Sequence, residues 1–258
     1  MANPNFSTLL SEAVNKPGSI MKAYTAFHNY SLGNQLLALF ECQRRGIEPG
    51  PINTFPRWQD LGRHVKKGER AITLCMPVTI KRKETDDNGE EQDNRFTTFV
   101  YKARWFVLAQ TDGKELEPPQ IPSWDSLKAL SALNVSQVPF TATDGNLQGY
   151  ARKRSVAVSP IAQLSHKTLF HELAHIILGH TLETDFNDTE RTPKCLREVE
   201  AESVAMLCCE ALNLEGAEFC RGYVQKWLKR AGNTVIPEKS AQKIVRAADQ
   251  IIKAGTTA

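Results

Sequence analysis

The feature that most constrains this chain is a pair of histidines four residues apart inside an apolar segment, KTLFHELAHIILGH (residues 167–180). In an α-helix, positions i and i+4 share one face, so the imidazoles of His171 and His175 can reach one ion. Glu172 is offset by one position and can reach a water molecule on that ion, as a general base should. Burying these polar groups among apolar neighbours is costly unless they have partners. The segment therefore predicts a helix with metal ligands His171 and His175 and a catalytic base, Glu172.

A second predicted helix, about residues 194–213, offers a carboxylate as the third ligand. Its apolar positions form a stripe that includes Glu200, whereas Glu198 and Glu202 are expected to point to the other side. A carboxylate on a buried helix face needs a compensating charge, which a divalent cation supplies. Glu200 is therefore the expected third metal ligand.

His180 is the competing candidate for the third ligand. It does not fall in the register of the three-histidine pattern H-E-x-x-H-x-x-G-x-x-H, so we interpret it as a surface or capping histidine and Gly179 as a helix C-cap. Two imidazoles and one carboxylate leave one coordination position open, as in catalytic zinc sites. The expected metal is Zn²⁺, and Mn²⁺ is also compatible with these ligands. Such a site predicts hydrolysis of a peptide bond, with Glu172 moving the proton.

The pattern along the chain indicates two domains of mixed structure. Residues 5–45 have helical periodicity, and β-branched and aromatic residues predict strands over 71–80 and 96–108. The charged segment between them predicts a long-looped antiparallel hairpin, with the acidic stretch 84–93 as a solvated loop. A proline-rich stretch, residues 112–123, is typical of a linker.

The remainder of the chain is predicted to be mainly helical. A short strand near 155–158 precedes four helical segments, at about 164–179, 194–213, 216–230 and 238–253. We therefore expect an α+β fold of two domains separated by the linker 112–123. Residues 1–111 would form a helix-plus-hairpin domain, and residues 124–258 a zincin-like metallopeptidase domain.

Several classes of protein are disfavoured by composition. No run of 18 apolar residues is present, so we expect no membrane span, and no secretory signal is visible at the N-terminus. The 6 cysteines show no C-x-x-C spacing, which favours reduced thiols. We therefore expect a cytoplasmic protein without a membrane partner.

Positive charge is concentrated in the first half of the chain. Between residues 44 and 83 there are ten Lys or Arg and three Asp or Glu, in a chain of net charge +3. Cations can pair with phosphates, and an aromatic ring that stacks on a base contributes about 1–3 kcal/mol, so this pattern favours single-stranded nucleic acid. An ordinary solvated basic loop, with Trp58 buried beside the hairpin, is the alternative. The candidate DNA-binding residues are Arg57, Trp58, Arg63, Lys66 and Lys67.

These stretches resemble the ArdC-type antirestriction proteins of conjugative plasmids. The pattern W-x-x-x-G-R-x-V-x-K-G-E is specific, whereas H-E-x-x-H occurs in many unrelated peptidases. The matching stretches are YSLGNQLLALF (30–40), FPRWQDLGRHVKKGERAITLCMPV (55–78), KTLFHELAH (167–175), REVEAESVAMLCCEAL (197–212) and GYVQKWLK (222–229).

The resemblance implies a domain that binds single-stranded DNA, followed by a metallopeptidase-like domain. It also implies that the protein protects incoming plasmid DNA from host restriction. The peptidase half is similar to the group whose third ligand is the Glu of an E-A-x-x-x-A helix, which Glu200-Ala201 fits. The acidic stretch 84–93 departs from the family pattern.

Three functional hypotheses follow. In the first, the protein is an antirestriction protein that binds single-stranded DNA and carries a zinc-type peptidase site. In the second, it is a soluble metalloprotease that cleaves a specific regulatory or nucleoprotein target, still unknown, with the N-terminal domain for recruitment. In the third, it binds DNA and its peptidase fold only binds a partner. The intact Glu172 favours retained hydrolysis, because a purely structural site does not need that base.

Overall fold

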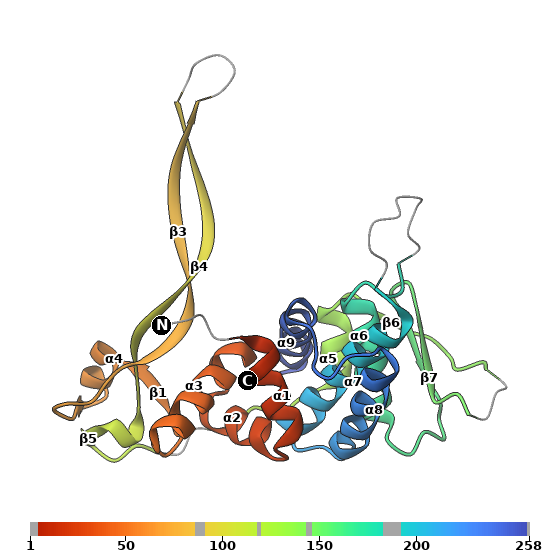
Figure 1. Ribbon diagram of the computed structural model, residues 1–258, viewed down its shortest axis with the longest axis horizontal. Helices are drawn as coiled ribbons and strands as arrows, with labels where there is room; N and C mark the ends of the chain where they lie inside the picture. The colour runs from red at the N-terminus through yellow and green to blue at the C-terminus, as the bar shows by residue number, and fades with distance from the viewer. Residues whose placement is uncertain (1–4, 86–90, 118–119, 143–145, 183–191, 257–258) are drawn as a thin grey trace. The chain divides into compact units, whose positions relative to one another are not determined.

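The computed structural model describes residues 5–85, 91–117, 120–142, 146–182 and 192–256. The chain forms two compact units (Figure 1). The first unit contains Leu37–Glu117, and the second joins Pro4–Leu36 to Pro118–Ala258. This division differs from the expected domain of residues 1–111, because the first two helices pack with the C-terminal part of the chain. No helix in the described ranges is long and apolar enough to cross a membrane.

The first unit is built on a long antiparallel hairpin. Strands β3 (Ile72–Thr85) and β4 (Glu91–Val107) pair along their length, and β1 (Ile52–Thr54) joins the other edge of β4. Figure 1 shows this hairpin as an extended, twisted ribbon. The unit is completed by α4 (Phe55–Asp60), β2 (Arg63–Val65), the short helix η1 (Leu108–Gln110) and β5 (Thr111–Gly113), which pairs with β2.

The hairpin strands are longer than the sequence pattern predicts. The acidic stretch 84–93 was expected to be a loop, but β3 continues to residue 85 and β4 begins at residue 91. The rest of that stretch, residues 86–90, lies outside the described residues. A two-stranded ribbon can expose both faces to water, so a charged sequence does not stop strand pairing there.

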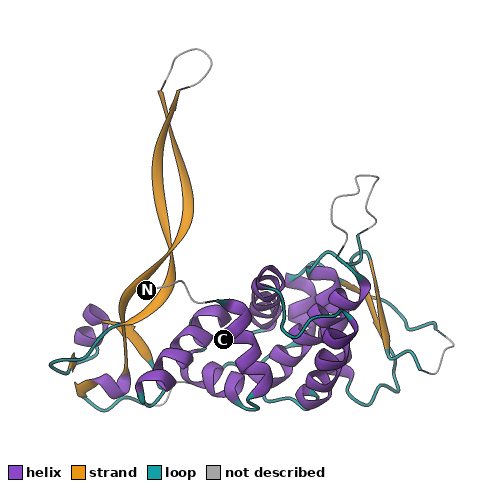
Figure 2. Cartoon of the chain, viewed as in Figure 1, coloured by secondary structure: helices purple, strands orange, loops and turns teal. Residues whose placement is uncertain are grey.

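The second unit is mainly helical, as the purple ribbons of Figure 2 show. A small sheet has the order β6-β8-β7, in which β8 is parallel to β6 and antiparallel to β7. The α+β fold class and the four expected C-terminal helices are confirmed. The elements are α1 (Phe6–Asn15), α2 (Ser19–Phe27), the start of α3 (Leu32–Arg45), α5 (Ser126–Ala132), β6 (Ser136–Gln137), β7 (Gly149–Arg152), β8 (Ser155–Val158), α6 (Ser165–Ile177), α7 (Lys194–Ala211), α8 (Ala217–Arg230) and α9 (Glu238–Gly255).

Helix α7 forms the centre of the second unit. Every residue from 199 to 211 is buried, and the helix contacts α2, α6, α8 and α9. The segment before residue 36 belongs to the same core, where Leu10 and Ile20 are fully buried. Arg221 joins the two parts, because it donates to the Val14 carbonyl at 2.9 Å and pairs with Glu210. Glu210 in turn accepts a hydrogen bond from the backbone N–H of Ile20 at 3.0 Å.

Candidate metal centre

Two histidines of α6 point at a common position. The Nε2 atoms of His171 and His175 are 3.1 Å apart, because the two residues are one helical turn apart on the same face. The helix is held in place by its opposite face, where Phe170, Leu173 and Ala174 are fully buried. It ends at Ile177, and Gly179 follows in the left-handed conformation (φ +76°), as the expected C-cap requires.

Glu198 of α7 completes the group. Its Oε2 lies 3.6 Å from His171 Nε2 and 3.9 Å from His175 Nε2. One ligand atom from each of the three residues lies within 4.8 Å of the others, and this is the metal-type cluster found among the described residues. Two nitrogens about 2.1 Å from one tetrahedral ion would be about 3.4 Å apart, so the spacing and the donor types both fit a divalent cation.

The expected third ligand, Glu200, is not part of this group. Its Oε2 is 2.9 Å from His180 Nε2, and its side chain is 1% exposed. Helix α7 is buried on all sides, so its apolar stripe does not mark the face that meets α6. The structure therefore places Glu198, and not the expected ligand Glu200, beside the two histidines. Glu202, also expected to point away, is buried with its Oε1 3.4 Å from His171 Nδ1.

His180 is the site residue that sequence reasoning missed. It was expected at the surface, but its side chain is only 6% exposed and its Nδ1 lies 3.0 Å from His175 Nδ1. The signal was present in Gly179, because a left-handed residue after a helix turns the next residue back toward the last turn. The backbone N–H of His180 accordingly donates to the His175 carbonyl at 2.8 Å.

Burial sets the protonation of the site. It lowers the pKa of His171 to about 3, with the nearby charge of His175 acting in the same direction. It also lowers the pKa of His175 to about 4. The pKa of Glu172 is raised to about 7, first by burial and then by the carboxylates of Glu198 and Glu202. For Glu200, burial raises the pKa, but hydrogen bonds from His180 and Ser240 outweigh it and the net shift is downward. Neutral imidazoles are the form that binds metals.

A cleft of about 610 Å³ opens beside Glu172 and His171. Its lining includes large apolar side chains that remain exposed, among them Ile161 (78%) and Phe219 (65%). Gly149 of β7 forms part of its wall, where an added Cβ would lie 2.6 Å from Thr168 Cγ2 and 3.3 Å from Glu172 Cγ. The absence of a side chain at Gly149 therefore leaves room for the expected catalytic base.

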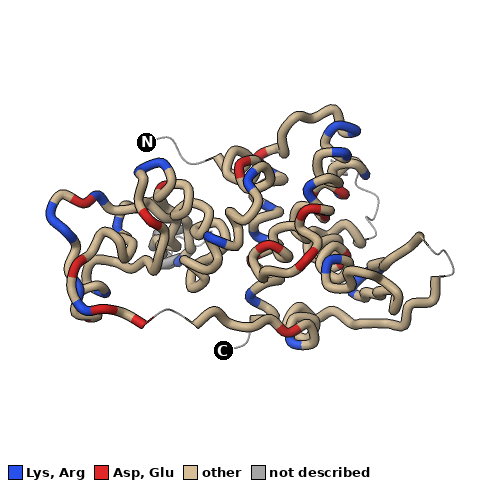
Figure 3. The backbone as a smooth tube through the Cα atoms, turned by 90° about the horizontal axis from the view of Figure 1, so that it is seen from below, with Lys and Arg blue, Asp and Glu red and all other residues tan. Residues whose placement is uncertain are grey.

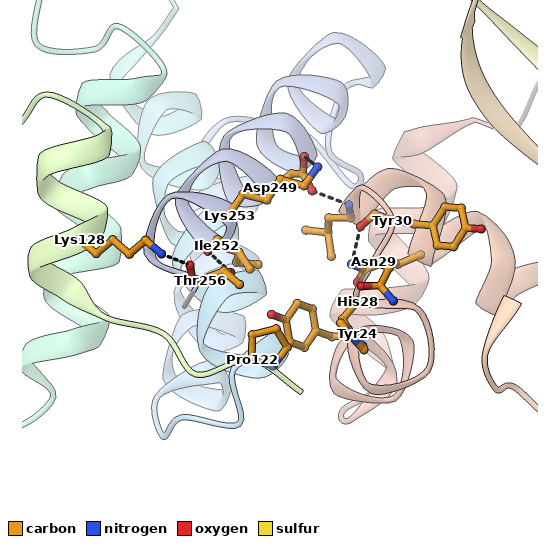
Figure 4. Close-up of a pocket in the computed structure, with 12 residues that line it drawn as sticks. Tyr24, His28, Asn29, Tyr30, Pro122, Lys128, Asp249, Ile252, Lys253 and Thr256 are labelled. Atoms are coloured by element: carbon orange, nitrogen blue, oxygen red, sulfur yellow. Dashed lines mark hydrogen bonds and ion pairs between the residues drawn. The ribbon is translucent and has the colours of Figure 1, made fainter. Parts of the chain in front are cut away.

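The second unit has another pocket, of about 360 Å³, between the α2–α3 junction and α9 (Figure 4). The charged side chains that line it already have partners within the protein. Lys128 Nζ donates to the Thr256 carbonyl at 2.7 Å, and Lys253 pairs with Asp249 at 2.8 Å. The other oxygen of Asp249 accepts from the backbone N–H of Leu32. The described metal-type cluster therefore remains the strongest candidate for chemistry.

The expected DNA-binding residues of the first unit have different environments. Trp58 is fully buried and its Nε1 donates to the Phe106 carbonyl at 2.8 Å, so it cannot stack on a base, which corrects its expected role. The guanidinium of Arg63 hydrogen-bonds to the Thr111 hydroxyl and carbonyl, which makes it structural. Arg57, Lys66 and Lys67 are exposed, with Arg57 3.8 Å from Asp60 and Lys66 3.6 Å from Asp112.

Exposed aromatic rings occur elsewhere in the first unit. Phe99 of β4 is 65% exposed and Phe55 of α4 is 45% exposed. Arg95 is also exposed and lies on the same face of β4 as Phe99, four positions away. Figure 3 marks the Lys and Arg positions of the first unit along its backbone in blue. Regular alternation along β4 would have placed Phe99 on the face of the buried residues Trp105 and Val107, and the register shift between Ile72 and Thr73 separates them.

The comparisons with known proteins agree with this architecture. A family model described as the N-terminal domain of anti-restriction factor ArdC matches residues 11–106. An uncharacterized protein of Bacillus anthracis is 22% identical over 260 residues, covering 77% of this chain and 41% of that protein. The chain thus spans about two fifths of the length of this curated relative.

Two solved structures share the fold. The metal-free crystal structure of antirestriction ArdC protein from the R388 plasmid has a TM-score of 0.54 and 20% identity, covering 96% of this chain and 94% of that one. The Mn(II)-bound structure of the same protein has a TM-score of 0.54 and 18% identity, covering 98% of each chain. Residues 11–106 therefore match the model of the ArdC N-terminal domain, and the chain shares the fold of the ArdC structures over nearly all of its length.

Proposed function

We propose that this chain is a plasmid antirestriction protein that binds single-stranded DNA through its first unit and hydrolyses a polypeptide at the metal centre of its second unit. The observation that carries the proposal is the convergence of His171, His175 and Glu198 beside Glu172, in a chain whose residues 11–106 match the ArdC N-terminal domain. The solved relatives bear the name antirestriction protein, which supports the biological role.

The metal would be held by His171, His175 and Glu198. The Mn(II)-bound relative favours a divalent cation, and imidazole and carboxylate ligands suit both Mn²⁺ and Zn²⁺. Such a cation lowers the pKa of water and polarises a carbonyl group when it is bound. Desolvation lowers the pKa of both histidines, which keeps them neutral and available.

Glu172 is the proposed general base. It is offset by one position from His171, so it stands beside the ligand group without belonging to it. Burial and the neighbouring carboxylates raise the pKa of Glu172 to about 7. A carboxyl group with this pKa can take a proton and return it near neutral pH. A purely structural metal site would not need this group.

The cleft favours a polypeptide as the substrate. Exposed apolar side chains line it together with Glu172, and Phe219 and Ile161 are large enough to contact bulky residues that flank a scissile bond.

Proteolysis of a specific regulatory or nucleoprotein target, with the first unit used for recruitment, is the second candidate. The third candidate, a DNA-binding protein whose peptidase fold only binds a partner, is disfavoured by the presence of Glu172.

The proposed DNA contact uses exposed groups of the first unit. Phe99 can stack on an unpaired base, while Arg95, Arg57 and Lys67 can pair with phosphates. Binding should weaken as salt rises, with a slope of about −0.7 per phosphate contacted on a single strand. A duplex offers no unpaired base to a ring, so single strands should bind more tightly.

The test is a restriction-protection assay. Unmodified plasmid DNA is transferred by conjugation into restricting and non-restricting hosts, in the presence of the wild type, Glu172→Ala or the control Glu215→Ala. The proposal expects wild-type protein and the control to raise recovery in the restricting host, and Glu172→Ala to lose this effect while keeping its metal. No protection by the wild type would refute the antirestriction role. Full protection by Glu172→Ala would favour the binding-module candidate instead.

A further inference from the structure

Three side chains form a buried hydrogen-bonded chain behind the metal centre. His175 Nδ1 lies 3.0 Å from His180 Nδ1, and His180 Nε2 lies 2.9 Å from Glu200 Oε2. The side chains of His180 and Glu200 are 6% and 1% exposed. Water therefore has little access to these contacts, and each nitrogen depends on its protein partner.

The local fold explains how His180 reaches this place. Gly179 takes the left-handed conformation (φ +76°), and the backbone N–H of His180 then bonds the His175 carbonyl at 2.8 Å. The following residue is fixed as well, because the Thr181 hydroxyl donates to the Lys153 carbonyl at 2.7 Å. The imidazole of His180 is thus held against that of His175 by the helix end itself.

The positions of the protons follow from one requirement. An imidazole nitrogen that binds a metal carries no proton, so His175 must bear its single proton on Nδ1 when Nε2 faces the metal position. Its Nδ1–H then donates to His180 Nδ1, which must accept. The proton of His180 is consequently on Nε2, from which it donates to the carboxylate of Glu200. Each donor has one acceptor, and all protons point away from the metal position.

The Nδ1 atom of His171 has a different neighbour from that of His175. His171 Nδ1 lies 3.4 Å from Glu202 Oε1 without forming a hydrogen bond. On α7, Glu202 is four residues after Glu198 and shares its face, whereas Glu200 lies about 160° away around the helix. Glu200 therefore acts on its histidine only through the intervening ring of His180.

We propose that His180 and Glu200 are positioning residues that fix the tautomer and ring orientation of His175, so that its Nε2 is presented to a divalent metal. The inference rests on the proposed metal site but assigns these two residues a role that ligation does not require. Outer partners of this kind typically change metal affinity by about 10–100-fold.

The first experiment measures the affinities of full-length protein for Zn²⁺ and Mn²⁺ by competition with a chromophoric chelator. His180→Ala should weaken binding by roughly 10–100-fold. His180→Asn should retain part of the affinity, because its amide oxygen can accept the His175 Nδ1–H. Glu200→Gln should fall between the wild type and His180→Ala. The control is His166→Ala, an α6 histidine whose ring contacts the Glu215 carbonyl instead.

The second experiment reads the tautomer itself. Long-range ¹H–¹⁵N NMR of the metal-free full chain should show His175 protonated on Nδ1 in the wild type, with this bias lost in His180→Ala. Thermal melting of each variant separates these effects from loss of fold. A wild type that binds neither metal would remove the proposed metal site, yet the NMR result would still decide the positioning role. Unchanged tautomer and affinity in folded His180→Ala would overturn the inference.

Discussion

At the scale of single residues, the order of glutamates along α7 decides what each can do. Glu198 and Glu202 are four positions apart and both approach the histidines of α6, whereas Glu200 is turned toward His180. Their burial differs as well, because Glu200 and Glu202 are both buried whereas Glu198 retains partial exposure. The carboxylate nearest the Nε2 atoms of the two histidines is thus the least buried of the three.

Glu198→Ala should remove most of the bound metal. The loss should exceed the roughly 10–100-fold expected for an outer partner, because a ligand atom itself disappears. Metal-to-protein ratios measured by elemental analysis after gel filtration test this, with exposed Glu215→Ala as the matched control. An undiminished ratio in Glu198→Ala, with a loss in Glu200→Ala, would return the ligand role to Glu200.

Gly149→Ala should disturb the site without touching a ligand. The new Cβ would lie 2.6 Å from Thr168 Cγ2 and 3.3 Å from Glu172 Cγ, so β7 or α6 must shift. Overpacking of this kind costs about 1–3 kcal/mol of unfolding free energy. We expect a lower melting temperature and slower peptide hydrolysis with metal still bound. Adding Thr168→Ser removes the nearest atom and should restore part of both, and a fully active, fully stable Gly149→Ala would contradict this packing argument.

At the scale of elements, the hairpin and α4 separate stabilising rings from exposed ones. Trp58 of α4 is fully buried and bonds the Phe106 carbonyl, whereas Phe99 of β4 is 65% exposed. An exposed ring on the same strand face as Arg95 has little effect on stability, and it remains available to a ligand. The same two elements therefore supply both the core of the first unit and its proposed contact surface.

Trp58→Ala and Phe99→Ala should have opposite effects. Removing the buried ring should cost about 3–5 kcal/mol of unfolding free energy. Removing Phe99 should leave stability nearly unchanged and weaken binding to single-stranded DNA by about 1–3 kcal/mol, with duplex binding unaffected. Denaturant unfolding and fluorescence anisotropy measure the two effects. Phe96→Ala, on the opposite face of β4, is the control; if it weakened binding and Phe99→Ala did not, the other face would be the contact surface.

At the scale of the whole molecule, the two units do not follow the order of the chain. The first two helices belong to the core of the second unit, and the division between the units falls between Leu36 and Leu37. Arg221 is central to this arrangement, since its guanidinium pairs with Glu210 and donates to the Val14 carbonyl while being only 7% exposed. The N-terminal helices are therefore a structural part of the unit that carries the metal centre.

Arg221→Ala should loosen the second unit selectively. Breaking a buried ion pair and leaving its partner unpaired costs about 3–5 kcal/mol. Hydrogen exchange followed by mass spectrometry should show faster exchange in α1, α2 and α7, with β3 and β4 unchanged. The control is Lys229→Ala, on an exposed position of the same helix. Equal protection of α1 and α2 in the variant and wild type would show that the ion pair does not hold them.

The local elements follow directly from patterns in the sequence. The i, i+4 spacing of His171 and His175 fixes both on one helix face, and Gly179 ends that helix, because both properties depend only on backbone geometry within a turn. The four C-terminal helices and the hairpin were predictable for the same reason, and the family pattern in residues 55–78 pointed to the ArdC type. The hairpin loop was predicted too long because charge does not prevent pairing in an exposed ribbon.

Which residues meet in the candidate site depends on packing between elements. Glu198 rather than Glu200 approaches the histidines because α7 is packed on all sides, so no hydrophobic stripe records the direction of α6. Trp58 is buried because a hairpin strand covers it, although its basic neighbours in sequence resemble a binding surface. The side chain of His180 reaches His175 because the chain turns back after α6. The N-terminal helices join the second unit through contacts with segments that are far away in the sequence. Such contacts depend on packing between elements, and periodicity within one element carries no information about them.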